Sequence, residues 1–299
     1  MIIGHQKQRN FLEQMVVSGR LPHALLFSGQ EKLGKRTVAL NLISRLFKET
    51  ADRLLGGRHP DFILVEPIQQ EFGQGARQIH INQIRELSWK LSLKPIRAQQ
   101  IAAIIDQAHL MTPEAQNCFL KTLEEPKGNG LLILITEYPH FLLPTILSRC
   151  EIIKFYPVKK KEISDFLEKR GTPKEKIGKI CQISLGKPGL AIDFLENPKK
   201  LEEREIKEKE LIRILNSNLV RRFEYIKELI QQENLKEILE IWLNYFRSVL
   251  LLKLKENYKF DLSIPQLENI LQQIQKTIFL ISTTNINQRL ALEILMLEL

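Results

Sequence analysis

The stretch FSGQEKLGKRTVAL, residues 27–40, decides how the first half of this chain folds. Gly29, Gly34 and Lys35 match the phosphate-loop pattern G-x-x-x-x-G-K-[ST], in which a tight loop joins a strand to a helix. Such a loop presents backbone N–H groups and a helix N-terminus to phosphate oxygens. The stretch therefore predicts a strand, a nucleotide-binding loop and a helix, although a glycine-rich turn without a ligand remains an alternative.

One position breaks this pattern, because Arg36 stands where a serine or threonine belongs. The hydroxyl at that position is a small oxygen ligand for magnesium, whereas a guanidinium has no lone pair and is itself cationic. Thr37 carries a hydroxyl, but one residue along a helix turns the side chain by about 100°. We expect a degenerate site that binds ATP or ADP weakly at most, requires no cofactor and holds no metal.

A second acidic motif follows the apolar run in IAAIID, residues 101–106. An aspartate at the end of a buried strand, here Asp106, matches the residue that orients the metal in phosphate-loop ATPases. Active ATPases place a glutamate next, to polarise the attacking water, and this chain has Gln107, which cannot act as a base. An ordinary strand end is the alternative, and it is the weaker one because of the loop upstream.

Strand-like and helix-like segments alternate over the first half of the chain, which predicts an α/β domain with a parallel sheet covered on both faces. Thr112 is placed to cap the helix that begins at Pro113. The helical segments include residues 81–91 and 113–125. The apolar runs expected to form strands are HALLFSG (23–29), FILVEP (62–67), QIAAIID (100–106), LLILITE (131–137) and EIIKFYP (151–157).

Beyond Pro157 the strand-like runs stop, and the sequence becomes rich in Lys and Glu with helical spacing. The final stretch, NQRLALEILMLEL, is apolar nearly all round, and such a helix needs burial within its domain or against a partner. We divide the chain into an α/β domain (1–157), a small helical lid domain (158–205) and an all-helical C-terminal domain (206–299).

Composition sets limits on the class of protein. The net charge of +9, from 44 basic and 35 acidic residues, fits contact with DNA phosphates and fits solvated helix faces equally well. No apolar run approaches the roughly 20 residues of a membrane span, and the N-terminal residues lack a signal-peptide core, so we expect a cytoplasmic protein without membrane contact. Cys118, Cys150 and Cys181 form no C-x-x-C pair, which argues against zinc.

The motifs between residues 100 and 150 are the most specific ones in the chain. They resemble the core of bacterial clamp-loader subunits of the AAA+ class, the group that includes the DNA polymerase III clamp loader. The triplet Ser148-Arg149-Cys150 and the segment FLKTLEEP (119–126) carry most of this likeness. Further similar stretches are RLPHALLFSG (20–29), HPDFILVEP (59–67), SLGKPGLAIDFL (184–195) and NINQRLALEIL (285–295).

The resemblance implies roles for particular residues. Arg149 corresponds to an arginine finger that reaches into the nucleotide site of a neighbouring subunit. Gly189 stands where motor subunits carry a second sensing arginine. Many members have a four-cysteine zinc module before the HPD triplet, but the interval 47–61 here has no cysteine, so no zinc is expected.

These features together favour a non-motor subunit of a clamp loader, with no intrinsic ATPase activity. The implied partners are the gamma/tau motor subunits, the delta subunit, the sliding clamp and, through the complex, primer–template DNA. The C-terminal helices would form an oligomerisation collar. Two other hypotheses stay open: an active AAA+ ATPase, supported by Lys35 and Asp106, and a nucleic-acid-binding module on a relic ATPase fold.

Overall fold

A computed structural model of the chain describes residues 2–56, 59–69, 77–126, 130–232, 234–256, 262–283 and 286–299. The chain divides into two compact units, residues 1–192 and residues 193–299. The boundary falls inside helix α9 (Pro188–Glu196), and the helices that follow the sheet, α7 (Lys160–Lys169) and α8 (Lys174–Ile183), belong to the first unit. The three-domain division expected from the sequence stays a prediction.

The first unit is built on a five-stranded, wholly parallel sheet with the order β2-β3-β4-β1-β5. Each strand lies within one of the five apolar runs, so the predicted α/β fold class with a parallel sheet is confirmed. Buried branched residues form most of the strands, as is typical of a sheet that is covered on both faces. The strands are β1 (Ala24–Ser28), β2 (Phe62–Val65), β3 (Ala102–Ile105), β4 (Leu131–Thr136) and β5 (Glu151–Lys154).

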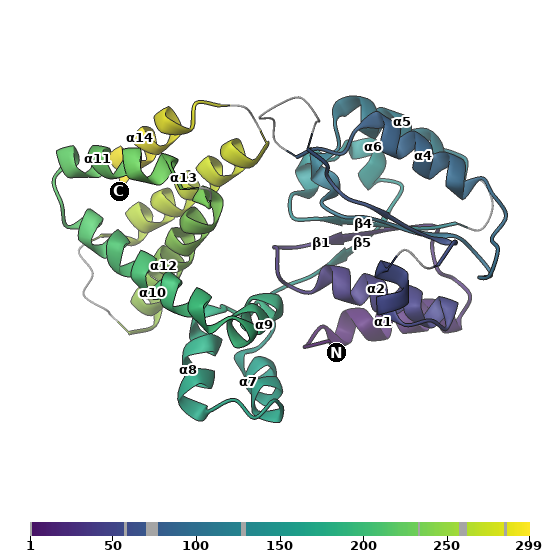
Figure 1. Ribbon diagram of the computed structural model, residues 1–299, viewed down its shortest axis with the longest axis horizontal. Helices are drawn as coiled ribbons and strands as arrows, with labels where there is room; N and C mark the ends of the chain where they lie inside the picture. Colours follow the sequence, from purple (N-terminus) through teal and green to yellow (C-terminus); the bar gives the residue numbers. More distant parts are fainter. Residues whose placement is uncertain are drawn as a thin grey trace. The chain divides into compact units, whose positions relative to one another are not determined.

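Helices cover both faces of this sheet (Figure 1). One buried cluster joins α1, α2 and α3 to one face, and a second joins α4, α5 and α6 to the other. Thr112 caps α5 as predicted, because its hydroxyl accepts a hydrogen bond from the Ala115 N–H at 3.2 Å. The helices are α1 (Gln6–Val17), α2 (Lys35–Phe47), α3 (Ala51–Leu55), α4 (Ile81–Leu91), α5 (Pro113–Glu124) and α6 (Pro144–Leu147), with 3₁₀ turns at Ala108–Leu110 and Pro139–Phe141.

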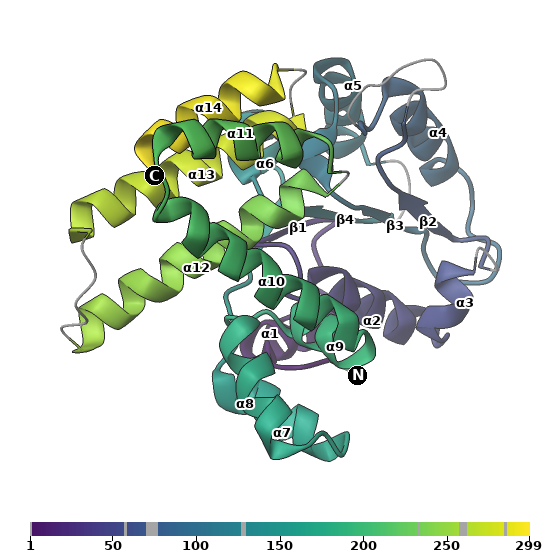
Figure 2. The same cartoon turned by 60° about the vertical axis from the view of Figure 1, so that its left-hand side comes forward.

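The second unit is entirely helical in its described residues, and its core forms around Trp242 and Phe246, which are fully buried. Tyr225 stacks on Trp242, with ring centroids 6.4 Å apart. Figure 2 shows α11 beside α14, and α12 packs along α13. None of the helices in the described ranges is long and apolar enough to cross a membrane. The helices are α10 (Pro198–Leu215), α11 (Leu219–Ile230), α12 (Leu235–Glu256), α13 (Ile264–Thr283) and α14 (Gln288–Glu298).

A buried carboxylate fixes the loop that enters β3. Asp61 is 2% exposed and accepts backbone N–H bonds from Ile96, Arg97 and Ala98, each at 2.7 Å. Burial alone would raise the pKa of Asp61, but these three donors outweigh it and the pKa is lowered. The ionised carboxylate is therefore part of the folded structure.

Asp61→Asn should lower the free energy of unfolding by about 1.5–3 kcal/mol, because charged acceptors make the stronger hydrogen bonds. The folded-state pKa is depressed, so this contribution is present above the unfolded pKa of about 4 and is lost as the pH falls through the folded value. The difference between wild type and Asp61→Asn, measured by urea unfolding, should therefore shrink in acid. Asp165→Asn, at an exposed position of α7, is the control and should change stability little at any pH. Equal effects of the two substitutions would contradict this role.

Candidate functional site: a degenerate phosphate loop

The loop between β1 and α2 has the geometry that its glycines predict. Gly29 has a φ of 151°, and a Cβ there would lie 2.5 Å from the carbonyl oxygen of Phe155, so no side chain fits. Its N–H donates to the Thr136 carbonyl at 3.2 Å, which ties the loop to the end of β4. Gly34 has a φ of 92° and is the N-cap of α2. The first residues of α2 therefore lie at the carboxyl edge of the sheet, where α/β proteins bind ligands.

Lys35 is buried within this loop, with 7% of its surface exposed. Its ammonium donates to the loop's own carbonyl oxygens, those of Gly29 and of Gln30, the latter at 2.6 Å. Burial lowers the pKa of Lys35 to about 8, and the nearby Lys187 adds to this, while Glu137 and other carboxylates oppose it. Lys35, the residue that would contact phosphates, thus donates hydrogen bonds to its own loop in this structure.

Arg36 forms ion pairs with two carboxylates from neighbouring strands. Its Nη1 atom lies 2.5 Å from Oε1 of Glu66 and 3.2 Å from Oδ2 of Asp106. Burial raises the pKa of Asp106, Arg36 opposes that effect only in part, and the net pKa is above its usual value. The position expected to lack a metal ligand therefore places a positive charge directly against the predicted metal-orienting aspartate.

Gln107 follows Asp106 in a left-handed backbone conformation, with a φ of 50°. Its N–H donates to Oδ1 of Asp106 at 2.9 Å, which helps to orient that carboxylate. An amide side chain at this place has no basic oxygen of the kind that activates water.

The position expected to have lost a sensing arginine packs directly on the loop. Gly189, in the first turn of α9, donates its N–H to the Lys32 carbonyl at 2.8 Å. A Cβ at Gly189 would lie 2.9 Å from the same oxygen, so even alanine requires the loop to shift. Backbone occupies the space next to the loop that a side chain in this position would need.

Arg149 lies elsewhere in the first unit, between α6 and β5. Its Nη2 atom pairs with Oε1 of Glu124, at the end of α5, at 2.8 Å, and its Nη1 donates to the Thr145 carbonyl at 3.0 Å. About a third of the side chain is exposed. The adjacent Cys150 packs against the sheet core, and burial raises the pKa of its thiol to about 12. The triplet thus places a partly exposed arginine beside a partly buried cysteine.

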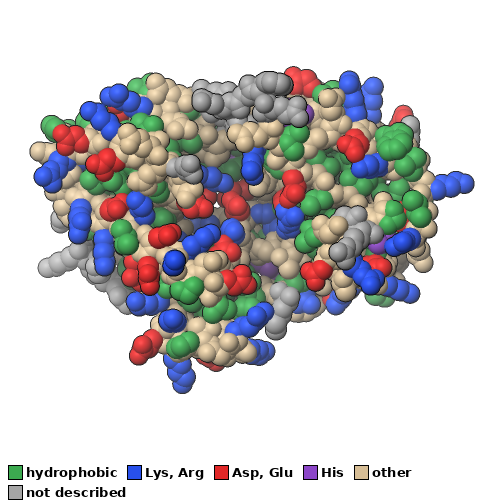
Figure 3. Space-filling model, in the orientation of Figure 1, with side chains coloured by type: hydrophobic (Ala, Val, Ile, Leu, Met, Phe, Trp, Pro, Cys, Tyr) green, Lys and Arg blue, Asp and Glu red, His purple; other side chains and the backbone are tan. Residues whose placement is uncertain are grey.

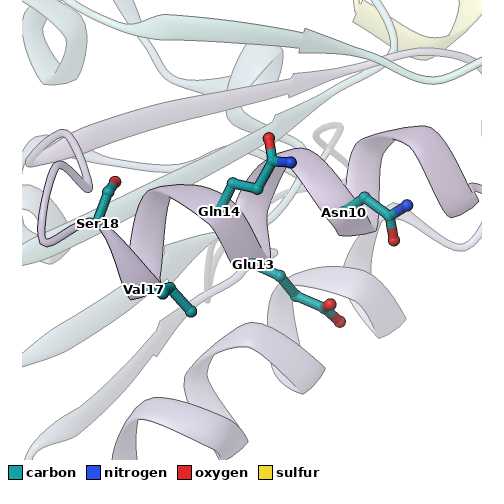
Figure 4. A pocket seen from close by; sticks show the side chains of 5 residues that line it. All are labelled: Asn10, Glu13, Gln14, Val17 and Ser18. Carbon is teal, nitrogen blue, oxygen red and sulfur yellow. The ribbon is translucent and has the colours of Figure 1, made fainter.

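A shallow hollow over α1 is a weaker candidate for a site (Figure 4). Its lining side chains all come from α1 and the residue after it, and Glu13 among them pairs with Arg45 of α2. Basic and acidic side chains are interspersed over the face of the molecule shown in Figure 3, so the excess positive charge of the chain is not concentrated on that face. The lining residues are Asn10, Glu13, Gln14, Val17 and Ser18.

Comparison with known proteins identifies the family. The family described as "DNA polymerase III, delta subunit" matches residues 4–159, more than half of the chain. This chain belongs to that family. The motifs of residues 100–150 predict a delta-prime subunit within the clamp-loader group, and the names of two relatives confirm this prediction.

The similar curated proteins include two bacterial delta-prime subunits. DNA polymerase III subunit delta' of Bacillus subtilis is 35% identical over 167 residues, which is 52% of this chain and 49% of that protein. The subunit of the same name from Pseudomonas aeruginosa is 31% identical over 140 residues, 43% of this chain and 41% of its own length. The replication factor C small subunit of Methanococcus maripaludis is 30% identical over 203 residues, which is 65% of this chain and 59% of that protein. The chain thus spans about half the length of the curated relatives it matches.

Among solved structures, the chain aligns with a gamma subunit-related protein of Thermotoga maritima. It has a TM-score of 0.44 and 19% sequence identity, and the alignment covers 98% of this chain and 97% of that one.

The structure brings most of the predicted site residues of this delta-family chain together. Gly29, Gly34, Lys35, Arg36 and Asp106 meet at one edge of the sheet, whereas Thr37 is exposed and Arg149 lies in a different place. The interval 47–61, in which no zinc is expected, includes residues 57–58, which lie outside the described residues.

Sequence reasoning missed two carboxylates near the loop. Glu66 pairs with Arg36, and Glu137 acts on the buried Lys35. The signal for both was present, since each directly follows a buried strand, as Asp106 does.

Gly189→Ala should destabilise the first unit by about 1–3 kcal/mol, because the new methyl group meets the Lys32 carbonyl and overpacking has costs of this size. Gly178→Ala in α8 is the matched control: its Cβ would meet nothing within 4 Å, and alanine favours the helix by about 0.5–1 kcal/mol. Urea unfolding of both variants measures the difference. A Gly189→Ala protein as stable as Gly178→Ala would show that the loop and α9 are not tightly packed.

Proposed function

We propose that this chain is the non-motor delta-prime subunit of a DNA polymerase III clamp loader, which completes its neighbour's ATPase site with Arg149 while its own site hydrolyses nothing. The observation that carries the proposal is the ion pairing of Arg36 with Asp106 and Glu66. A cation fixed to the metal-orienting carboxylate leaves no ordinary magnesium site for phosphoryl transfer.

Two further features support the proposal that this chain's own nucleotide site does not hydrolyse nucleotide. Gln107 offers no base for the attacking water. Gly189 supplies no sensing arginine, and its close contact with Lys32 leaves no room for one. Each loss removes charge stabilisation or positioning, on which phosphoryl transfer depends. ATP or ADP binding at this loop would then be weak and would serve assembly or stability rather than catalysis.

The finger role of Arg149 is supported by the chemistry around it. A partly exposed arginine that pairs with the carboxylate of Glu124 is available to a competing anion such as a γ-phosphate. The Thr145 carbonyl limits where the side chain lies, so little ordering is needed on binding.

The proposed partners follow from this assignment. They are the gamma/tau motor subunits, the delta subunit, the sliding clamp and, through the assembled complex, primer–template DNA in the cytoplasm. Lys35 and Asp106 favour the alternative of an active ATPase, and steady-state hydrolysis by the isolated chain above about 0.1 per second would place that alternative first.

The exposed face of α14 is the proposed assembly surface of the second unit. Leu290, Ile294 and Leu297 are 56%, 53% and 62% exposed, and their spacing puts them on one side of the helix. Val220, which is 66% exposed, lies on α11, the helix that packs beside α14. Exposed apolar side chains grouped on one helix face are typical of an interface between proteins.

Arg149→Ala should leave assembly of a reconstituted loader intact but reduce hydrolysis at one adjoining motor site by about 10³-fold or more, because fingers supplied in trans contribute about 10³–10⁵. Single-turnover hydrolysis by the complex measures this loss, which should be partial over the whole ring. Arg149→Lys should restore little, since an ammonium lacks the planar fork.

The matched control for that experiment is Arg45→Ala. Arg45 is also a partly exposed arginine paired with a glutamate, Glu13, but it is not part of the triplet. Its removal should leave every motor site active. Unchanged single-turnover rates in the Arg149→Ala complex would exclude the finger role.

Leu290→Lys combined with Ile294→Lys should prevent the chain from joining the loader on a sizing column, because two charges on an apolar interface remain desolvated and unpaired. The circular-dichroism melting curve should hardly change, since both positions are exposed. Gln288→Lys places a charge on an exposed position of the same helix outside this face and should assemble normally. Normal assembly of the double variant would exclude α14 as the interface.

A further inference from the structure

We propose that Arg36 is a built-in cation that occupies the place of a divalent metal ion, so that the phosphate loop of this chain is indifferent to magnesium. This proposal extends the assignment of the loop as a degenerate nucleotide site. Only the nucleotide-binding experiment rests on that assignment; the metal-binding experiment does not. It further implies a latent metal site, formed by Asp106 and Glu66, that Arg36 keeps closed.

The sheet places the two carboxylates side by side. Strands β2 and β3 are parallel neighbours, with Val65 opposite Ile105, so the residues that follow them emerge at the same edge. The Asp106 N–H also donates to the Val65 carbonyl at 2.9 Å, which continues the pairing one step beyond the strands. The backbone at Glu66 and Asp106 is thus positioned by the sheet, independently of the arginine.

A single nitrogen of Arg36 contacts both carboxylates. Its Nη1 atom is 2.5 Å from Glu66 and 3.2 Å from Asp106, and Arg36 itself is the second residue of α2, the position that the phosphate-loop pattern gives to a metal-binding hydroxyl. The guanidinium therefore connects the same three places, a helix start and two strand ends, that an ion at this site would connect.

The charge around the pair explains why a cation is needed there. Asp106 is mostly buried, and both burial and the charge of Glu66 raise its pKa, while Arg36 lowers it. Two carboxylates this close repel one another unless a positive group lies between them. A hard divalent ion with oxygen ligands would neutralise them, and so does a guanidinium, but the guanidinium has no lone pair and excludes the ion by charge.

Removing the arginine should open the site. In Arg36→Thr a hydroxyl joins the two carboxylates, which makes three oxygen ligands of the type that Mg²⁺ and Mn²⁺ prefer. Arg36→Lys keeps a positive charge and should stay indifferent to metal. Arg36→Thr combined with Asp106→Asn keeps the hydroxyl but loses the central carboxylate, so it should bind no ion at the loop.

The test uses the full chain without nucleotide, with Mn²⁺ as the probe, titrated by electron paramagnetic resonance. Wild type and Arg36→Lys should show no site at the loop, and Arg36→Thr should gain one with a Kd on the order of 1 mM, which the added Asp106→Asn should abolish. A site in wild type that Asp106→Asn removes would overturn the proposal, and so would an Arg36→Thr protein that folds and binds no Mn²⁺. Arg36→Gln, which removes the charge but keeps a hydrogen-bonding group, is the second variant if the threonine protein does not fold, and it too should gain a site.

A nucleotide-binding experiment distinguishes a failure of this inference from a failure of the proposed function. Binding of a fluorescent ADP analogue to wild type should be the same in EDTA and in Mg²⁺, and binding that requires Mg²⁺ would overturn the role of Arg36. If the analogue does not bind at all, the nucleotide site of the proposed function fails, and the Mn²⁺ titration alone decides the role of Arg36.

Discussion

The parallel pairing of the sheet is the constraint on which the site depends. In a parallel sheet all the strands end at the same edge, so residues that follow different strands are brought together without any contact in sequence. The register places Ser28 opposite Thr136 and Val65 opposite Ile105. The glycine loop after β1 and the carboxylates after β2 and β3 therefore share one edge.

Charges gathered at such an edge must be neutralised by one another or by ligands, because burial opposes ionisation. This chain uses its own side chains. Lys35 is held by loop carbonyls, with its pKa lowered by burial, and Asp106 has its pKa raised mainly by burial and partly restored by Arg36. The charges of Lys35, Arg36 and Asp106 are thus paired within the chain, in contrast to a site whose charges are neutralised by a bound triphosphate and metal.

Close backbone packing also holds the phosphate loop in place. Close approaches of backbone at Gly29 and Gly189 hold the loop against β5 and α9, and neither position has room for a side chain. Arg149, by contrast, is partly exposed and, among the described residues, pairs with the one carboxylate of Glu124. This contrast between a closely packed loop and an accessible arginine is the basis of our proposal that the chain acts on a neighbouring subunit.

The sequence alone determined the α/β class, the five strands and the Thr112 cap, because these depend on local apolar runs and on capping chemistry within a few residues. It also identified Arg36 and Gln107 as departures from an active site, and the resemblance to clamp-loader subunits added Gly189. Only the tertiary structure showed that Glu66 shares Arg36 with Asp106, because strands 40 residues apart meet through sheet order, which periodicity does not encode. The positions of buried charges likewise depend on packing from several elements, and no single stretch of sequence contains that information.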